Sequence, residues 1–350
     1  MQVRQWITIP AKIALLTIAL FAIFMVSSMV TGMTRLSAPG ATTEAPPATG
    51  ESTRDLQSAS NTESDNTRAT ATESDTRNAT PTVPAGQAKA ALGFLAACFL
   101  QSSVLAYVIM YSRWHGLRLG FTIFAILFGL TAIMTHLEMV VFMPRALTEG
   151  VLPRMIGMNF VTAALFAPLA VLVLGKFRST PTQPRPAPNP AVRTKDLITC
   201  LLAAIAVYLV LYFTFGYFII WQDPTARAFY GGDPNADVAS AASLTGLVQM
   251  FTGQPKLVLL QSARALMWVA LAWPVVRMMT GGAASAALAV ALLFGVLFPS
   301  QLLVPNPWMP DHVRWLHLLE TSTSTFLFGL FVGWQLHRLS APVDRSYLRK

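Results

Sequence analysis

A histidine and a glutamate lie one helical turn apart near the end of the chain, inside a run of residues that is otherwise mostly apolar. His317 and Glu320 belong to residues 311–338, DHVRWLHLLETSTSTFLFGLFVGWQLHR, a stretch long enough to cross a bilayer as one helix. Ionisable side chains are costly within a membrane, so they are retained where they have a partner or a function. The pair is therefore the first candidate for a site that binds a ligand, an ion or a proton.

Further polar residues fall at a similar depth in other apolar runs of the chain. They are Glu138, Asn159, Gln261 and Arg264. A helix rises about 1.5 Å per residue, and counting along each run places these residues in the same half of the bilayer as Glu320. A common depth predicts one cluster formed by Glu138, Asn159, Gln261, Arg264, His317 and Glu320.

Arg264 determines which pairing is expected inside this cluster. A guanidinium does not lose its proton in a protein, so a buried one needs a carboxylate beside it. Only Glu138 and Glu320 lie at its depth, and we expect one or both to pair with it, with Glu320 favoured and His317 beside it. Two interpretations stay open. The cluster is either a buried ion pair that fixes helix packing, or the lining of an outward-facing pocket for a small polar ligand or ion.

Helical phase adds a second expectation about the residues near Glu138. Thr131, Thr135 and Glu138 share one face of a regular helix. His136 then lies about 200° away from Glu138 around the helix axis. We therefore expect His136 to point away from the cluster.

A metal site and an enzymatic site are weaker alternatives. His317 and Glu320 resemble, in reversed order, the spacing of metal ligands in di-iron helical bundles, and His312 is close by. Such a site needs carboxylates from other helices, of which only Glu138 is available, and a neighbouring Arg264 repels a metal ion. We therefore expect no metal and no cofactor, and a metal-dependent intramembrane enzyme is the third possibility.

Sequence motifs of common enzymes are missing from the chain. It contains no CxxC, HExxH, GxSxG, GxxxxGK[ST] or GxGxxG motif. Cys98 and Cys200 fall in different apolar runs and at different depths, so we do not expect a disulfide between them. We therefore expect no catalytic residues, and an enzyme is not the favoured class.

Composition assigns the chain to integral membrane proteins. Hydrophobic residues make up 54% of it and charged residues 12%, whereas about a quarter of the residues of an average soluble domain are charged. Eight apolar runs reach the length of about 20 residues that a membrane helix needs. They are residues 6–33, 89–111, 117–143, 153–174, 197–221, 256–279, 283–303 and 313–336. The predicted fold is an all-α, polytopic membrane protein of about eight transmembrane helices.

The changes in composition along the sequence divide the chain into four parts. Residues 1–33 are expected to form an uncleaved anchor helix, because the apolar stretch is longer than that of a typical signal peptide and no small-x-small cleavage site follows. Residues 34–88 are rich in Thr, Ser, Ala and Pro and predict a disordered tether. Residues 89–338 form a seven-helix membrane domain with a proline-rich linker at 179–190, and residues 339–350 form a basic tail.

The distribution of lysine and arginine predicts the orientation. With a cytoplasmic N-terminus, the inner segments hold fourteen of these residues and the short outer loops five, as the positive-inside rule requires. Both termini are then cytoplasmic and the tether is extracytoplasmic, most simply in a bacterial inner membrane. We expect the basic face to contact anionic lipid rather than nucleic acid; the sequence identifies no protein partner.

Two outer loops mix aromatic residues with Pro, Gly, Asp and Arg. They are residues 221–237 and 304–315. The simplest interpretation is an aromatic belt with tight turns. The alternative is a rim above Glu320, made of Asp223, Arg227, Tyr230, Asp311 and His312.

Overall fold

The computed structural model describes residues 2–33, 85–142, 147, 150–178, 192–235, 243–305 and 309–340. Within these residues the regular structure is helical, apart from one isolated bridge between Ser112 and Met279. This confirms the predicted all-α class. The expected linker at 179–190, most of the tether and most of the basic tail lie outside the described residues.

Seven helices of the described part are long and apolar enough to cross a membrane. They are Thr8–Val30, Gly86–Met110, Gly116–Phe142, Val151–Val173, Thr194–Ile220, Pro255–Met278 and Ala283–Leu303. The eighth predicted span forms helix α13, Asp311–Ser340, whose 30 residues are long enough but which is not among these seven. Its histidine, glutamate, serine and threonine residues lower its mean hydropathy, so its place in the bundle depends on its packing.

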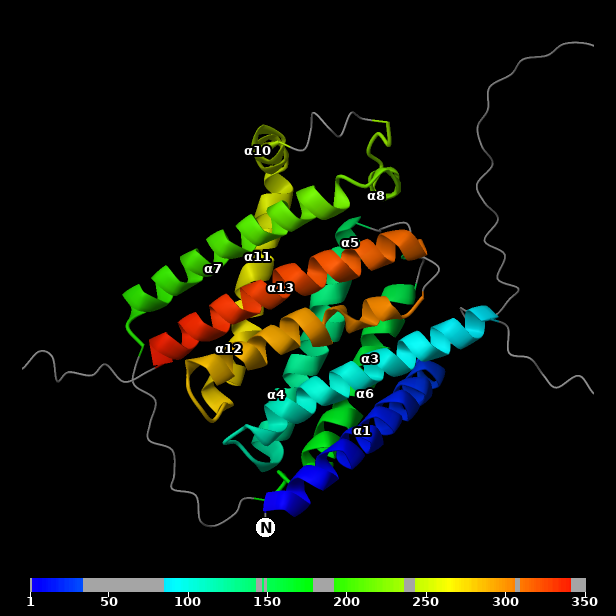
Figure 1. Ribbon diagram of the computed structural model, residues 1–350, viewed down its shortest axis with the longest axis vertical. Coiled ribbons are helices and arrows are strands. Elements are labelled where there is room, and N and C mark those ends of the chain that lie inside the picture. Colours follow the sequence, from blue (N-terminus) through cyan, green and yellow to red (C-terminus); the bar gives the residue numbers. More distant parts are fainter. Residues whose placement is uncertain are drawn as a thin grey trace, which may run out of the picture.

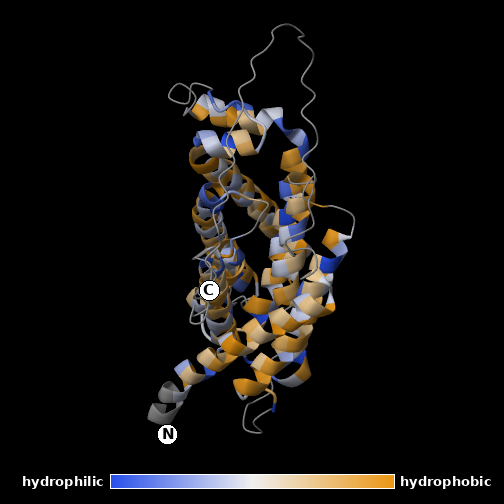
Figure 2. Ribbon diagram, turned by 90° about the vertical axis from the view of Figure 1, so that its right-hand side faces the viewer, coloured by the Kyte–Doolittle hydropathy of each residue, from blue (hydrophilic) through white to orange (hydrophobic). Residues whose placement is uncertain are grey.

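The helices are arranged in two layers (Figure 1). The nearer layer contains α7 (Thr194–Phe215), α13, α12 (Ala283–Leu292), α3 (Ala85–Met110) and α1 (Gln2–Val30). The second contains α11 (Pro255–Met278), α4 (Gly116–Phe128) with its continuation α5 (Thr135–Phe142), and α6 (Val151–Val173). The layers are joined because α11 packs on α7, α12 and α13, and α6 packs on α1. Apolar residues cover most of the length of these helices (Figure 2).

Helix α3 begins earlier than the sequence suggested. Residues 85–88 were expected to end the disordered tether, but they form its first turn. The segment AGQAKAAL is rich in alanine, which has the highest helix propensity, so the helix extends beyond the apolar run.

Helices α12 and α13 approach each other closely through small residues. A Cβ atom added to Gly329 would lie 2.6 Å from the Cα of Ala291, and one added to Gly333 would lie 2.6 Å from the Cα of Ala287. Small residues permit this approach between membrane helices. The contact holds α13 firmly against α12, and with it the polar residues that α13 carries.

Three transmembrane helices contain a π-helical segment. These are η1 (Gly129–Met134), η3 (Gly216–Ile220) and η4 (Leu293–Leu297), after which a short turn, η5 (Pro299–Leu303), ends the α12 span. A π-turn is wider than an α-turn and is frequent near functional sites. The Thr135 hydroxyl donates to the carbonyl of Leu130, five residues earlier, at 3.2 Å. The regular helix assumed in placing Thr131, Thr135 and Glu138 on one face is therefore wrong.

Two short helices lie at the end of the bundle opposite the N-terminus, called here the α8 end (Figure 1). Helix α8, Pro224–Phe229, follows η3, and α10, Leu244–Gly253, precedes α11. Ile220, Ala226 and Val313 form a small apolar cluster that packs the α8 segment onto α13. The loop after α7 is thus a folded cap.

Candidate functional site

The first part of the candidate site joins three helices around Arg264. This arginine of α11 is 2% exposed, and its Nη1 forms an ion pair with the Oε1 of Glu138 in α5. The same Nη1 donates to the Oε1 of Gln261 at 2.9 Å, and the Tyr208 hydroxyl of α7 donates to that oxygen at 3.3 Å. A single polar network therefore connects α5, α7 and α11.

The second part surrounds Glu320 of α13. The Tyr230 hydroxyl, just beyond α8, lies 2.5 Å from the Nε2 of His317, and the Nδ1 of His317 lies 3.6 Å from the Oε2 of Glu320. The Thr321 hydroxyl donates to the same carboxylate oxygen at 2.9 Å. The glutamate side chain is 9% exposed, and its other oxygen, Oε1, is not among the fully buried side-chain atoms that lack a hydrogen-bond partner.

The pairing differs from the one that the sequence favoured. Glu320 was the preferred counter-ion of Arg264, but Glu138 forms the ion pair. Glu320 is instead held within α13 by His317 and Thr321. The two glutamates lie at similar depths, so depth alone does not predict which of them pairs with Arg264. The pairing depends on the direction in which each helix turns its carboxylate.

Tyrosines bring the two parts together. The Tyr208 hydroxyl donates to Gln261 of the Arg264 network, the Tyr230 hydroxyl lies beside His317 of the Glu320 network, and the Tyr212 ring lies 6.2 Å from that of Tyr208. Burial, and then the two carboxylates, raise the pKa of Tyr230 above its ordinary value, so its hydroxyl keeps the proton that it can donate. Because α13 packs on α7 and α11, the networks around Arg264 and Glu320 are neighbours, and together we call them the tyrosine-carboxylate cluster.

Sequence reasoning missed two of these tyrosines and gave the third a different place. Tyr208 and Tyr212 lie four residues apart on α7 and were not considered, although this spacing places them on one helix face. Tyr230 was a rim residue in the alternative interpretation of the outer loops, and its side chain reaches His317. Aromatic residues are common in membrane helices, so composition does not single out these three.

The charges of the tyrosine-carboxylate cluster do not balance. Arg264 contributes one positive charge against the carboxylates of Glu138 and Glu320, which leaves one negative charge when His317 is neutral. Two donors, Gln261 Nε2 and Arg264 Nε, are buried and lack a hydrogen-bond partner among the described residues. An unsatisfied buried donor costs about 1–3 kcal/mol. With a neutral His317, the site thus lacks one positive charge, and it also contains two unused donors.

Two further polar residues, one in α6 and one in α5, have contacts within their own helices. Asn159 was expected in the cluster, and it donates at 3.0 Å to the carbonyl of Met155 in its own helix, α6, which packs on α1, α3, α4 and η1. No hydrogen bond in the described structure joins Asn159 to the cluster, so its membership stays a prediction. His136 is buried with its Nδ1 2.6 Å from the carbonyl of Ala132, and no contact in the described structure joins it to Glu138.

At the α8 end, Asp223 and His312 form one link between the cap and α13. The Nε2 of His312 lies 2.8 Å from the Oδ2 of Asp223, whose Oδ1 accepts the backbone N–H of Ala226 at 2.8 Å and so caps α8. Partial burial acts to raise the pKa of Asp223, but the hydrogen bonds from His312 and the backbone outweigh it and lower the pKa below its ordinary value. Asp223 therefore stabilises the cap as a carboxylate.

Arg227 and Asp311 have structural contacts instead of facing a common opening. Arg227 is buried, and its guanidinium donates only to backbone carbonyls, those of Trp221, Gln222, Asp233 and Pro234. Asp311 is exposed and accepts at 2.9 Å from Arg314, which also donates to the carbonyl of Leu302. The Arg227 side chain closes the loop that surrounds it, and the rim stays a prediction.

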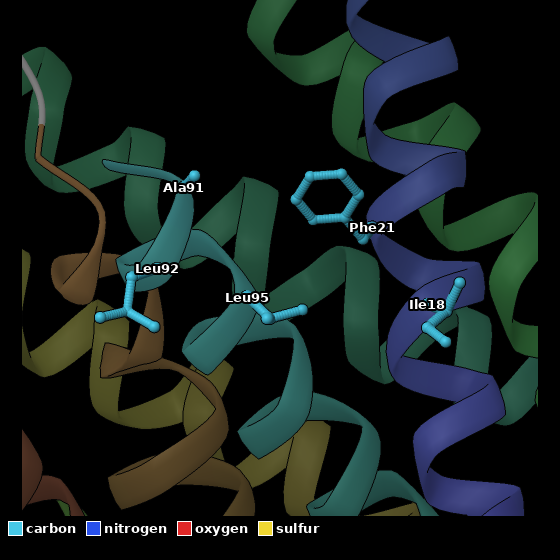
Figure 3. A pocket seen from close by; sticks show the side chains of 5 residues that line it. All are labelled: Ile18, Phe21, Ala91, Leu92 and Leu95. Atoms are coloured by element: carbon cyan, nitrogen blue, oxygen red, sulfur yellow. The ribbon is translucent and has the colours of Figure 1, made fainter. Parts of the chain in front are cut away.

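Metal-binding geometry is not found in the described part of the chain. No three His, Cys, Asp or Glu side chains among those residues converge as metal ligands would. Cys98 and Cys200 are buried and free. A cavity of about 360 Å³ between α1 and α3 is lined by Ile18, Phe21, Ala91, Leu92 and Leu95 (Figure 3). This lining is entirely apolar, so the cavity offers nothing that would bind a polar ligand.

The fold and the tyrosine-carboxylate cluster define a polytopic helical membrane protein with a buried charged site towards one end of its bundle. Comparisons with protein-family models, with curated proteins and with solved structures find no match for the chain.

Proposed function

We propose that this membrane protein binds a small cation at the tyrosine-carboxylate cluster, as the ligand site of a transporter or a membrane receptor. The observation that carries the proposal is the presence of two carboxylates, Glu138 and Glu320, against one guanidinium, Arg264. A buried charge without a partner is costly. A bound cation removes the imbalance.

The two carboxylates have different parts in this proposal. The Glu138–Arg264 pair is balanced and fixes α5 against α11. Glu320 has only the weaker contacts of His317 and Thr321, and both are made by its Oε2. The Glu138 side chain is 35% exposed, so the pair itself is not sealed. Glu320 is therefore the expected ligand of the cation, with Glu138 beside it.

The competing proposal is that the cluster only fixes helix packing. The complete burial of Arg264 and its direct pairing with Glu138 favour this second function. It predicts that Glu320 can lose its charge without effect on binding, because nothing binds. The two proposals therefore differ at Glu320, and one experiment separates them.

That experiment measures the unfolding midpoint of the full chain in lipid nanodiscs with increasing sodium, potassium or methylammonium chloride. A cation at 100 times its Kd stabilises the folded state by about 2.7 kcal/mol. We expect at least one salt to raise the midpoint, and Glu320→Gln to abolish the shift. Asp311→Asn, which neutralises an exposed carboxylate of the same helix, should leave it unchanged. The packing function holds instead if no cation shifts the midpoint of either protein.

We further propose that the α8 end is extracytoplasmic, in a bacterial inner membrane with both termini in the cytoplasm. The excess of Lys and Arg in the short segments of the opposite end supports this orientation. Cysteines introduced as Asp233→Cys and Lys195→Cys, in a chain without Cys98 and Cys200, test it. A membrane-impermeant maleimide should label the first in intact cells and the second only after lysis. The reverse pattern would invert the orientation.

A further inference from the structure

We propose that the cation is an organic ammonium ion that also carries an oxygen atom, and that the tyrosines of α7 and the α8 segment form the walls of its site. This inference rests on the proposed function, since it names the class of cation that the tyrosine-carboxylate cluster takes. It is carried by three features of the cluster: its aromatic walls, its unpaired polar atoms and its small number of oxygen ligands.

The aromatic walls come from several elements. The rings of Tyr208 and Tyr212 lie 6.2 Å apart on α7, and Tyr230 lies 6.2 Å from Phe142 at the end of α5, edge to face. Tyr208 contacts Gln261, the partner of Arg264, and Tyr230 contacts His317, the partner of Glu320. Aromatic faces attract cations through the ring quadrupole, and a site that surrounds an ammonium group with rings is the usual form of this recognition.

Oxygen ligands are too few for a bare metal ion. Calcium takes six to eight oxygen ligands and magnesium prefers an octahedral set, whereas the cluster offers two carboxylates. One of these, Glu138, already pairs with Arg264, which places a second positive charge close to any metal. An alkylated ammonium ion spreads its charge over carbon and needs fewer oxygens. Ring faces and one carboxylate without an arginine partner, that of Glu320, suit such an ion.

The unpaired polar atoms point to a ligand that is more than a bare ammonium group. The Nε2 of the fully buried Gln261 has no hydrogen-bond partner among the described residues, while its Oε1 is bonded to Arg264 and Tyr208 within the cluster. Glu320 is more than nine-tenths buried, and its Oε2 lies beside His317 and Thr321. The carboxylate oxygen would face the ammonium group. The amide would donate to an oxygen of the same molecule, so a hydroxylated ammonium ion matches both.

The test uses choline, tetramethylammonium and dimethylbutanol as probes on the full chain in nanodiscs, with calorimetric titration as the readout. Dimethylbutanol is the uncharged isostere of choline in which carbon replaces the ammonium nitrogen. We expect choline to bind more tightly than tetramethylammonium, sodium or potassium, and dimethylbutanol not to bind. Glu320→Gln should remove choline binding.

Variants of Tyr212 test the walls separately from the charge. A cation–π contact is worth about 0.5–2 kcal/mol, so Tyr212→Leu should weaken choline binding by about 2- to 30-fold, while Tyr212→Phe keeps it. The matched control is Tyr111→Leu. It removes a half-exposed tyrosine that directly follows the last residue of α3, away from the cluster, and it should have no effect on choline binding. If Tyr212→Leu does not fold, the ammonium inference is tested on the unsubstituted protein, by comparing its affinity for choline with its affinity for dimethylbutanol.

The outcomes separate this inference from the function on which it rests. If sodium or potassium binds and Glu320→Gln abolishes that binding, while no ammonium probe binds, the proposed function stands and the ammonium inference is overturned. Equal binding of choline and dimethylbutanol would also overturn it, because the site would then recognise shape without charge. If no cation of any kind binds, both fall together.

Discussion

Removal of Arg264 tests most directly how the helices around the site are held together. Arg264→Met leaves a side chain of similar length and strands the carboxylate of Glu138. Breaking a buried ion pair at one partner costs about 3–5 kcal/mol when both charges are buried. Arg264 is 2% exposed but the Glu138 side chain is 35% exposed, so solvent can hydrate the stranded carboxylate. We therefore expect a loss of about 2–3 kcal/mol, below the fully buried range.

A double-mutant cycle then isolates the pair. Glu138→Gln combined with Arg264→Met removes both charges, so the double variant should recover most of the loss and show a coupling of about 2 kcal/mol. The assay is reversible unfolding in mixed micelles with increasing dodecyl sulfate. Lys256→Met, at the exposed start of the same helix, is the control and should stay within about 0.5 kcal/mol of the unsubstituted protein. A loss below about 1 kcal/mol for Arg264→Met, or additive effects of the two substitutions, would refute the reasoning.

Three further predictions follow from the packing and the charges. Glu320→Gln should stabilise the protein without a bound cation by about 1 kcal/mol, because it removes the uncompensated charge; a clear loss in the same unfolding assay would make Glu320 a necessary packing partner. Gly329→Ala should cost about 1–3 kcal/mol, since its Cβ would meet the backbone of Ala291 at 2.6 Å, whereas Gly86→Ala meets nothing within 4 Å and should be harmless; equal effects would contradict the close approach of α12 and α13. Asp223→Ala should weaken the α8 cap by about 1 kcal/mol, seen as faster hydrogen exchange of the α8 amides. Because the pKa of the Asp223 carboxyl in the folded protein is lowered from its ordinary 3.8, its stabilisation of the cap is complete above pH 3.8 and is lost as the pH falls through the folded pKa. If the exchange rates of Asp223→Ala and the unsubstituted protein still differ below that pKa, the carboxylate is not the source of the stabilisation.

The helical membrane class and the extent of most spans could be predicted from the sequence, because an apolar run of about 20 residues has few alternatives to a membrane helix. Arg264 identified the ion pair as well, since a buried guanidinium needs a carboxylate. The choice between Glu138 and Glu320 was not predictable. It depends on the direction in which a helix turns each side chain, and that direction changes at a π-segment such as η1.

The remainder of the site depends on which helices become neighbours. Asn159 has the right depth but belongs to α6, which packs on α1 and α4. Tyr208 joined the cluster because α7 packs beside α11 and α13, and nothing in its local sequence indicates these neighbours. Residue type and depth therefore identified the charged members of the site, while its aromatic walls required the three-dimensional arrangement.

The π-segment η1 also has a consequence for how this protein would be compared with relatives. A π-turn contains one residue more than the α-turn that it replaces, so η1 is equivalent to an α-helix with a single inserted residue. A homologue that is α-helical throughout would carry the equivalent of Glu138 one position earlier relative to the start of the span. An alignment that forbids gaps inside transmembrane segments would then match Glu138 with an apolar residue and conceal the shared carboxylate. Alignments that search for homologues should therefore allow a one-residue gap between positions 129 and 134.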